Sequence, residues 1–107
     1  MNDVEFTEDL AEQVLTWRKV RNDDGIFAWV DNDGLIAPIS FGPLCDWNHT
    51  MVIVDKLLSE GWVLHMSIHP EAKLYECELE RQGDFIRAQD PHSQRATCLA
   101  ALRTVET

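Results

Sequence analysis

The fold is decided by residues 62–88, which read WVLHMSIHPEAKLYECELERQGDFIRA. Apolar and polar side chains alternate over 62–69 and again over 73–81. This period of two is typical of strands with one buried face. Short turns separate these strands from each other and from a third at 85–88, so we expect an antiparallel meander. The expected apolar faces are Trp62, Leu64, Met66 and Ile68 in the first strand, and Tyr75, Cys77 and Leu79 in the second.

Apolar residues at helical spacing predict three helices around this meander, over residues 4–19, 47–60 and 92–103. The acids in the first half of 4–19, followed by Arg18 and Lys19 at its end, suit the helix dipole. The expected boundary residues are Asn2 with Glu5, or Asp3, for the first helix, Asp46 and Gly61 for the second, and Asp90 with Pro91 for the third. The expected inward side chains are Phe6, Leu10, Val14, Leu15 and Trp17, then Trp47, Met51, Val54, Leu57 and Leu58, then Ala96, Leu99 or Ala100, and Leu102.

Two further strands are predicted between the first and second helices. The β-prone runs 26–30 and 35–39 flank the loop 31–34, which reads DNDG and is typical of a hairpin. The element order is therefore α-β-β-α-β-β-β-α. We expect a single acidic α+β domain over residues 1–107, built from layers of helix and sheet.

Composition excludes two large functional classes. The chain has 107 residues, 19 acidic and 9 basic, and its net charge of -10 opposes direct binding to nucleic acid. No apolar run approaches the roughly 20 residues that cross a bilayer, so we expect no membrane contact. Residues 1–10 carry four carboxylates and no base, unlike a targeting signal. Three widely spaced cysteines suit reduced thiols, and we expect a cytoplasmic protein.

Three stretches together resemble a known family. They are residues 10–17 (LAEQVLTW), the run from 41–46 (FGPLCD) through 52–57 (VIVDKL) to 60–62 (EGW), and 96–102 (ATCLAAL). Their order is similar to the phage ABA sandwich domain family, whose members are small proteins of phages and prophages. The resemblance implies a phage or prophage origin and a helix/sheet/helix sandwich. It implies no reaction and assigns no functional residue.

No catalytic constellation is present in the sequence. It lacks a phosphate-binding glycine loop, a pair of metal-binding cysteines and a nucleophile elbow. His65 and His69 share a strand face but would lie roughly 13 Å apart, which is too far to ligate one metal. Cys45 and His49 are spaced as a metal pair without an obvious further ligand. We expect a non-enzymatic protein without catalytic residues, metal or cofactor.

The acidic residues are the candidate binding site. The carboxylates of the strand 73–81 recur at period two and would line one face at intervals of roughly 6.6–7 Å. Four aspartates crowd the two loops of the expected hairpin. The candidate partner-binding residues are Glu76, Glu78, Glu80, Asp23, Asp24, Asp31 and Asp33. They are either a solvated surface or a face that binds a basic groove on a host protein. The second interpretation predicts an anti-CRISPR-like inhibitor that imitates nucleic acid and blocks a host nucleic-acid or defence complex in the host cytoplasm.

Two other function classes stay open. An aromatic-anchored protein-interaction module would use Trp29 or Trp62, because Trp17 and Trp47 are expected on buried helix stripes. A small-ligand-binding domain would need a pocket with convergent polar groups. A homo-oligomer also stays open, because the edge strands of a three-stranded sheet can pair with another copy.

Overall fold

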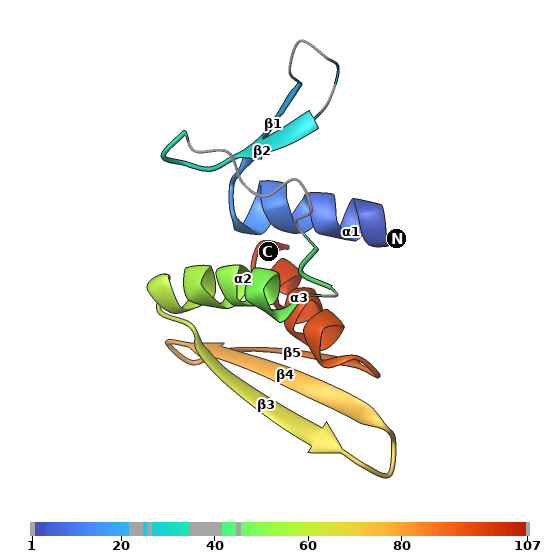
Figure 1. The fold of residues 1–107 in the computed structure, drawn as a ribbon. Coiled ribbons are helices and arrows are strands. Elements are labelled where there is room, and N and C mark those ends of the chain that lie inside the picture. The colour runs from blue at the N-terminus through green and yellow to red at the C-terminus, as the bar shows by residue number, and fades with distance from the viewer. Residues whose placement is uncertain (1, 22–24, 26, 35–41, 45, 107) are drawn as a thin grey trace.

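The computed structural model (Figure 1) describes residues 2–21, 25, 27–34, 42–44 and 46–106. Its helices are α1 (Asp3–Asp9), which continues as the π-helical segment η1 (Leu10–Val14), α2 (Trp47–Ser59) and α3 (Ser93–Arg103). Its strands are β1 (Arg18–Arg21), β2 (Phe27–Val30), β3 (Val63–His69), β4 (Leu74–Arg81) and β5 (Asp84–Asp90). The α+β class and the order α-β-β-α-β-β-β-α are confirmed.

The antiparallel meander is confirmed, with β4 between β3 and β5. Its register places Met66 opposite Cys77 and Cys77 opposite Ala88. Cys77 is buried against α3, whose buried side chains include Ala96 and Ala100. Because these side chains are small, α3 can approach the sheet closely. The core therefore lies between α3 and the β4–β5 half of the sheet.

The layers stack in the order hairpin, helices, sheet (Figure 1). The β1–β2 hairpin lies beyond α1, and α2 and α3 lie between α1 and the meander. The described helices are thus all on one side of the three-stranded sheet, instead of covering it from both faces. The other face of the sheet carries no described helix and is available to solvent.

The first helix ends earlier than the predicted range of 4–19. Asn2 caps it as predicted, with its side chain accepting from the Glu5 N–H at 2.8 Å. Helical structure stops at Val14 because Thr16 adopts a positive φ of 58°. The Trp17 N–H then bonds back to the carbonyl of Ala11 at 2.9 Å, which closes the helix end.

The segment predicted as the end of that helix is instead the strand β1. Arg18 and Lys19 therefore do not occupy a helix terminus, and Arg18 lies opposite Val30 in the hairpin. All four β1 residues are exposed. The strand therefore lacks the alternation of buried and exposed residues from which a strand can be predicted. The predicted strand at 26–30 is confirmed as β2 over Phe27–Val30, and its predicted neighbour at 35–39 lies outside the described residues.

The ends of α2 are as predicted, but its buried face is not. Asp46 caps the helix by accepting from the Asn48 N–H at 2.9 Å, and Gly61 follows its end with a φ of 91°. The buried side chains are Thr50, Ile53 and Leu57, whereas the predicted inward residues Trp47, Met51 and Leu58 are exposed. The Thr50 hydroxyl donates to the Pro43 carbonyl at 2.6 Å, which lets this polar residue be buried.

Two expectations around the sheet also need correction. The predicted inner face of β3 is largely unburied: Leu64 is half-buried, and Met66 and Ile68 are exposed. The N-cap position of the third helix is His92 rather than Asp90, and the His92 side chain makes no capping hydrogen bond. The Asp90 carboxylate instead accepts from the His92 N–H at 2.9 Å, so Asp90 closes a turn ahead of the helix.

Candidate protein-interaction surface

The apolar stripe that the sequence analysis placed in the core of α2 is on the surface. Trp47 is 48% exposed, Met51 45% and Leu58 51%. At about 100° of rotation per residue, this stripe lies roughly a quarter of a turn from the buried residues of α2. Helix α2 therefore has two apolar sides, one against α3 and one that the described residues leave open.

The sheet continues this apolar surface. Helix α2 contacts β3 along one side, while α3 covers β4 and β5. The far half of β3 is left uncovered, with Met66 38% and Ile68 64% exposed on its helix-facing side. We define the α2–β3 surface as the side chains of Trp47, Met51, Leu58, Met66 and Ile68.

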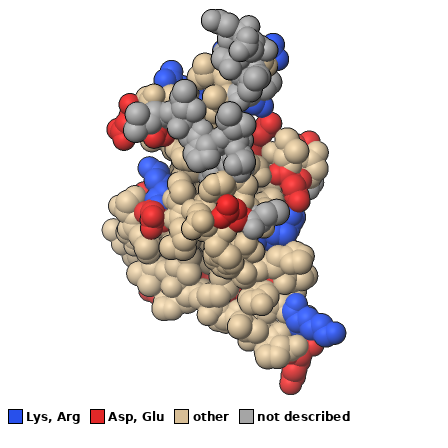
Figure 2. Space-filling model, viewed as in Figure 1, with Lys and Arg blue, Asp and Glu red and all other residues tan. Residues whose placement is uncertain are grey.

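Strand β3 contains no Lys, Arg, Asp or Glu, whereas α2 carries Asp55 and Lys56 and is flanked by Asp46 and Glu60. Figure 2 shows acidic and basic side chains spread over the upper part of the molecule, with a wide uncharged area below. The lower charged residues in this view sit at the tip of the sheet. Uncharged, apolar surface beside an edge strand is typical of an interface with another protein chain.

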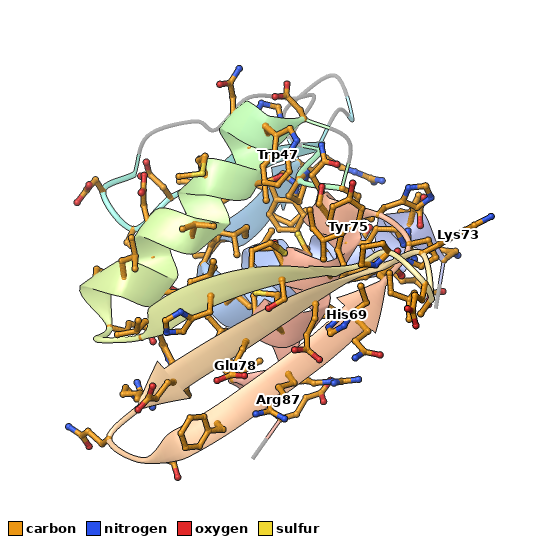
Figure 3. All side chains as sticks on the ribbon, turned by 90° about the horizontal axis from the view of Figure 1, so that it is seen from below. Trp47, His69, Lys73, Tyr75, Glu78 and Arg87 are labelled. Carbon is orange, nitrogen blue, oxygen red and sulfur yellow. The ribbon has the colours of Figure 1, made fainter. Side chains whose placement is uncertain are left out.

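The three glutamates of β4 lie on the opposite, helix-free face of the sheet. Figure 3 shows Glu78, Arg87 and His69 on this face, with Trp47 in the helix layer behind the sheet. The Arg87 Nε donates to a Glu78 carboxylate oxygen at 2.8 Å. The cation therefore neutralises Glu78, and the pair reduces the negative potential predicted for this strand.

Glu76 is also satisfied within the sheet. The Gln89 side-chain amide donates to its carboxylate at 2.8 Å, and His69 Nε2 lies 3.7 Å from it. The hydrogen bond from Gln89 holds the pKa of Glu76 below its ordinary value, and the charges of His69 and Arg87 act in the same direction. Glu80 completes the row, opposite Val63 and Phe85.

The aspartates of the candidate site lie elsewhere. Asp31 and Asp33 belong to the turn after β2, in the hairpin layer, where the Asp31 carboxylate accepts from the Asp33 N–H at 2.9 Å. Asp23 and Asp24 lie outside the described residues. The described candidate residues therefore form two separate acidic groups, one on the sheet and one on the hairpin, rather than one site.

The described residues offer little for catalysis or metal binding. They contain no group of three or more His, Cys, Asp or Glu side chains placed to hold a metal ion. His49 Nδ1 accepts from the Gly42 N–H at 2.8 Å, and its expected metal partner Cys45 lies outside the described residues. Burial raises the pKa of Cys77 to about 11 and that of Cys98 to about 12, which keeps both thiols protonated and poorly nucleophilic.

Two of the four tryptophans differ from expectation: Trp62 is buried and Trp47 is exposed. Trp62 is buried, with the Arg81 guanidinium stacked 4.3 Å from its ring centroid. Trp29 and Trp17 are partly buried against the core, and Trp47 is the exposed one. One signal was available: α2 carries more apolar residues than one buried stripe can accommodate.

The fold and this surface define a small α+β domain that presents an apolar face beside an open sheet edge. The chain belongs to the phage ABA sandwich domain family, whose sequence pattern matches residues 8–102. It is therefore a phage protein domain. It is similar in structure to a phage protein from Bacillus cereus ATCC 14579, with a TM-score of 0.71 over 98% of this chain and 93% of that one. At 14% identity, this likeness shows only that the two proteins share a fold.

No curated protein matches the chain. No helix among the described residues is long and apolar enough to cross a membrane.

Proposed function

We propose that this phage domain is a non-enzymatic protein-interaction module that acts in the host cytoplasm by burying the α2–β3 surface against another protein chain. The observation that carries this proposal is the exposure of Trp47 within an apolar surface next to an edge strand. Large apolar side chains are left exposed together at a free-energy cost, which binding recovers. No observation of comparable weight favours the small-ligand alternative.

Trp47 is expected to be the anchor of this surface. Tryptophan is enriched among residues whose truncation costs 2 kcal/mol or more of binding free energy. Trp47→Ala should therefore weaken capture of the partner by about 30-fold or more, a factor that corresponds to about 2 kcal/mol. The measurement is affinity capture by the immobilised chain from lysate of cells that carry the phage, followed by titration of whatever binds.

Val4→Ala is the matched control. Val4 is 67% exposed on α1, away from the α2–β3 surface, so its truncation should leave capture unchanged. Circular dichroism of both variants checks that each keeps its helices. Equal capture by the Trp47 variant and the parent chain, with both folded, would overturn the proposal.

The acidic mechanism predicted from the sequence is a second candidate. It is supported by the net charge of -10, which favours encounter with a basic groove of a host nucleic-acid or defence complex. In this mechanism the domain would be an anti-CRISPR-like inhibitor that imitates nucleic acid and occupies that groove. The ion pair of Glu78 with Arg87 and the hydrogen bond of Glu76 weigh against these particular glutamates as its contacts.

Salt dependence separates the two candidates. Replacing Glu76, Glu78 and Glu80 together by Gln would weaken capture and flatten its salt dependence if these carboxylates contact a basic partner. If the apolar surface is the interface, we expect this triple variant to bind as well as the parent chain, and high salt to leave capture intact. Comparing capture at low and high salt measures the difference.

A further inference from the structure

The edge strand β3 lacks the devices that usually protect the edge of a sheet. Its seven residues, VLHMSIH, include no Lys, Pro, Asp or Glu, in a chain with 19 acidic residues. Six of the seven residues are exposed. Among the described residues, β3 has a neighbouring strand on one side only. An exposed edge without charges is a template for pairing with another strand.

The opposite edge of the same sheet is protected. Strand β5 carries Asp84, Arg87 and Asp90. In addition, the Arg103 side chain donates a hydrogen bond to the main-chain carbonyl of Arg87. Charged side chains and occupied main-chain groups both discourage strand addition. The contrast singles out β3 as the edge at which a further strand can be added.

We propose that β3 pairs antiparallel with β3 of a second copy of this chain, around a two-fold axis at Met66. This inference rests on the proposed function, because it names the partner that covers the α2–β3 surface. Opposite residues of antiparallel strands share a face of the sheet. On the helix side, Leu64 of each copy then lies opposite Ile68 of the other, and the two Met66 side chains meet at the axis.

The sequence of β3 suits this self-pairing on both faces. On the helix-free side, His65 of each copy lies opposite Ser67 of the other. No two side chains of the same charge therefore face each other across the contact. A chain with a net charge of -10 repels its own copies, and a self-contact must therefore avoid carboxylates. Strand β3 meets this condition along its whole length. The two three-stranded sheets would become one continuous sheet, in which neither β3 strand is an edge strand any longer.

The same contact accounts for the exposed stripe of α2. Because α2 borders β3, pairing at β3 brings the two α2 helices to the same side of the joined sheet, next to the axis. The exposed parts of the α2–β3 surface amount to on the order of 500 Å² per copy, since large apolar side chains carry roughly 150–250 Å² each. The main chain of β3 adds to this area, which brings it toward the roughly 800 Å² per partner of a specific interface. A two-fold contact needs one self-complementary surface, and this region of the chain provides it.

Sedimentation equilibrium of the intact chain tests the pairing. The parent protein should sediment at twice its chain mass of 12.3 kDa. Ile68→Lys places an ammonium group opposite Leu64 of the second copy, so the dissociation constant should rise by about tenfold or more, because an unpaired charge is costly to bury. Phe85→Lys is the matched control, since Phe85 is similarly exposed (58%) but lies on β5. It should leave the dimer intact.

Crosslinking gives a second readout that does not depend on destabilising the fold. Met66→Cys should form a disulfide-linked dimer on mild oxidation, because the two introduced thiols face each other across the axis. Phe85→Cys should stay uncrosslinked. A monomeric parent protein, or crosslinking of the Phe85 variant as readily as the Met66 variant, would overturn the self-pairing. If Trp47-dependent capture of a different protein persists with a monomeric chain, the proposed function stands and only this inference fails.

Discussion

Leu57→Ala is expected to lower the free energy of unfolding by about 2–5 kcal/mol, the range for truncation of a buried leucine. Leu57 is 1% exposed and lies on the side of α2 that packs against α3. The lost methyl groups leave a cavity between the two helices, which the small side chains of α3 cannot fill. Small domains are typically stable by 5–15 kcal/mol, so this loss should be readily measurable in urea unfolding.

The neighbouring Leu58→Ala is the control for this prediction. Leu58 is 51% exposed, although the sequence analysis placed it on the buried stripe. In unfolding of the monomer, its truncation should change the free energy by less than about 0.5 kcal/mol, as for most surface substitutions, because the contact proposed for Leu58 forms only in the dimer. The two variants together test which side of α2 faces the core. If Leu58→Ala lowered the free energy of unfolding more than Leu57→Ala, the Leu58 side would face the core.

The stability of the protein should fall steeply in alkaline solution because of two buried thiols. The pKa of Cys77 is raised to about 11 and that of Cys98 to about 12, in both cases chiefly by burial. An unfolded cysteine has a pKa of about 8.5, so the unfolded chain releases these protons first as the pH rises. The stabilisation from the protonated thiols is complete below about pH 8.5 and is lost as the pH rises toward the folded-state pKa values. Between these limits each thiol contributes a slope of up to about 1.4 kcal/mol per pH unit.

Cys98→Ala isolates one of these contributions. The variant should be somewhat less stable at neutral pH, because Cys98 is fully buried, and its stability should fall less steeply from about pH 9 to 11. All other titratable groups are common to both proteins, so their contributions cancel in the difference. Urea unfolding at a series of pH values measures both slopes. Equal slopes in the two proteins would contradict a raised pKa at Cys98.

The charge of the acidic candidate site depends on contacts between neighbouring strands. The period of two in β4 correctly places Glu76, Glu78 and Glu80 on one face of the sheet. Their partners Arg87 and Gln89 come from β5, and the register between two strands decides which side chains meet. A row of carboxylates in one strand therefore does not by itself define a negative surface, since the neighbouring strand can neutralise it.

The sequence alone determined the α+β class, the strand β2, the antiparallel meander, the caps at Asn2 and Asp46 and the stop at Gly61. These features depend on alternation and on hydrogen bonds between residues a few positions apart, so they are encoded locally. Only the tertiary structure decided that Trp47 is exposed, that the described helices share one side of the sheet and that no described strand pairs with the outer edge of β3. The physical reason is that α2 carries two apolar stripes of similar size. Which of them is buried depends on the shape of α3, whose small residues accept Ile53 and Leu57 and leave the other stripe for a further contact.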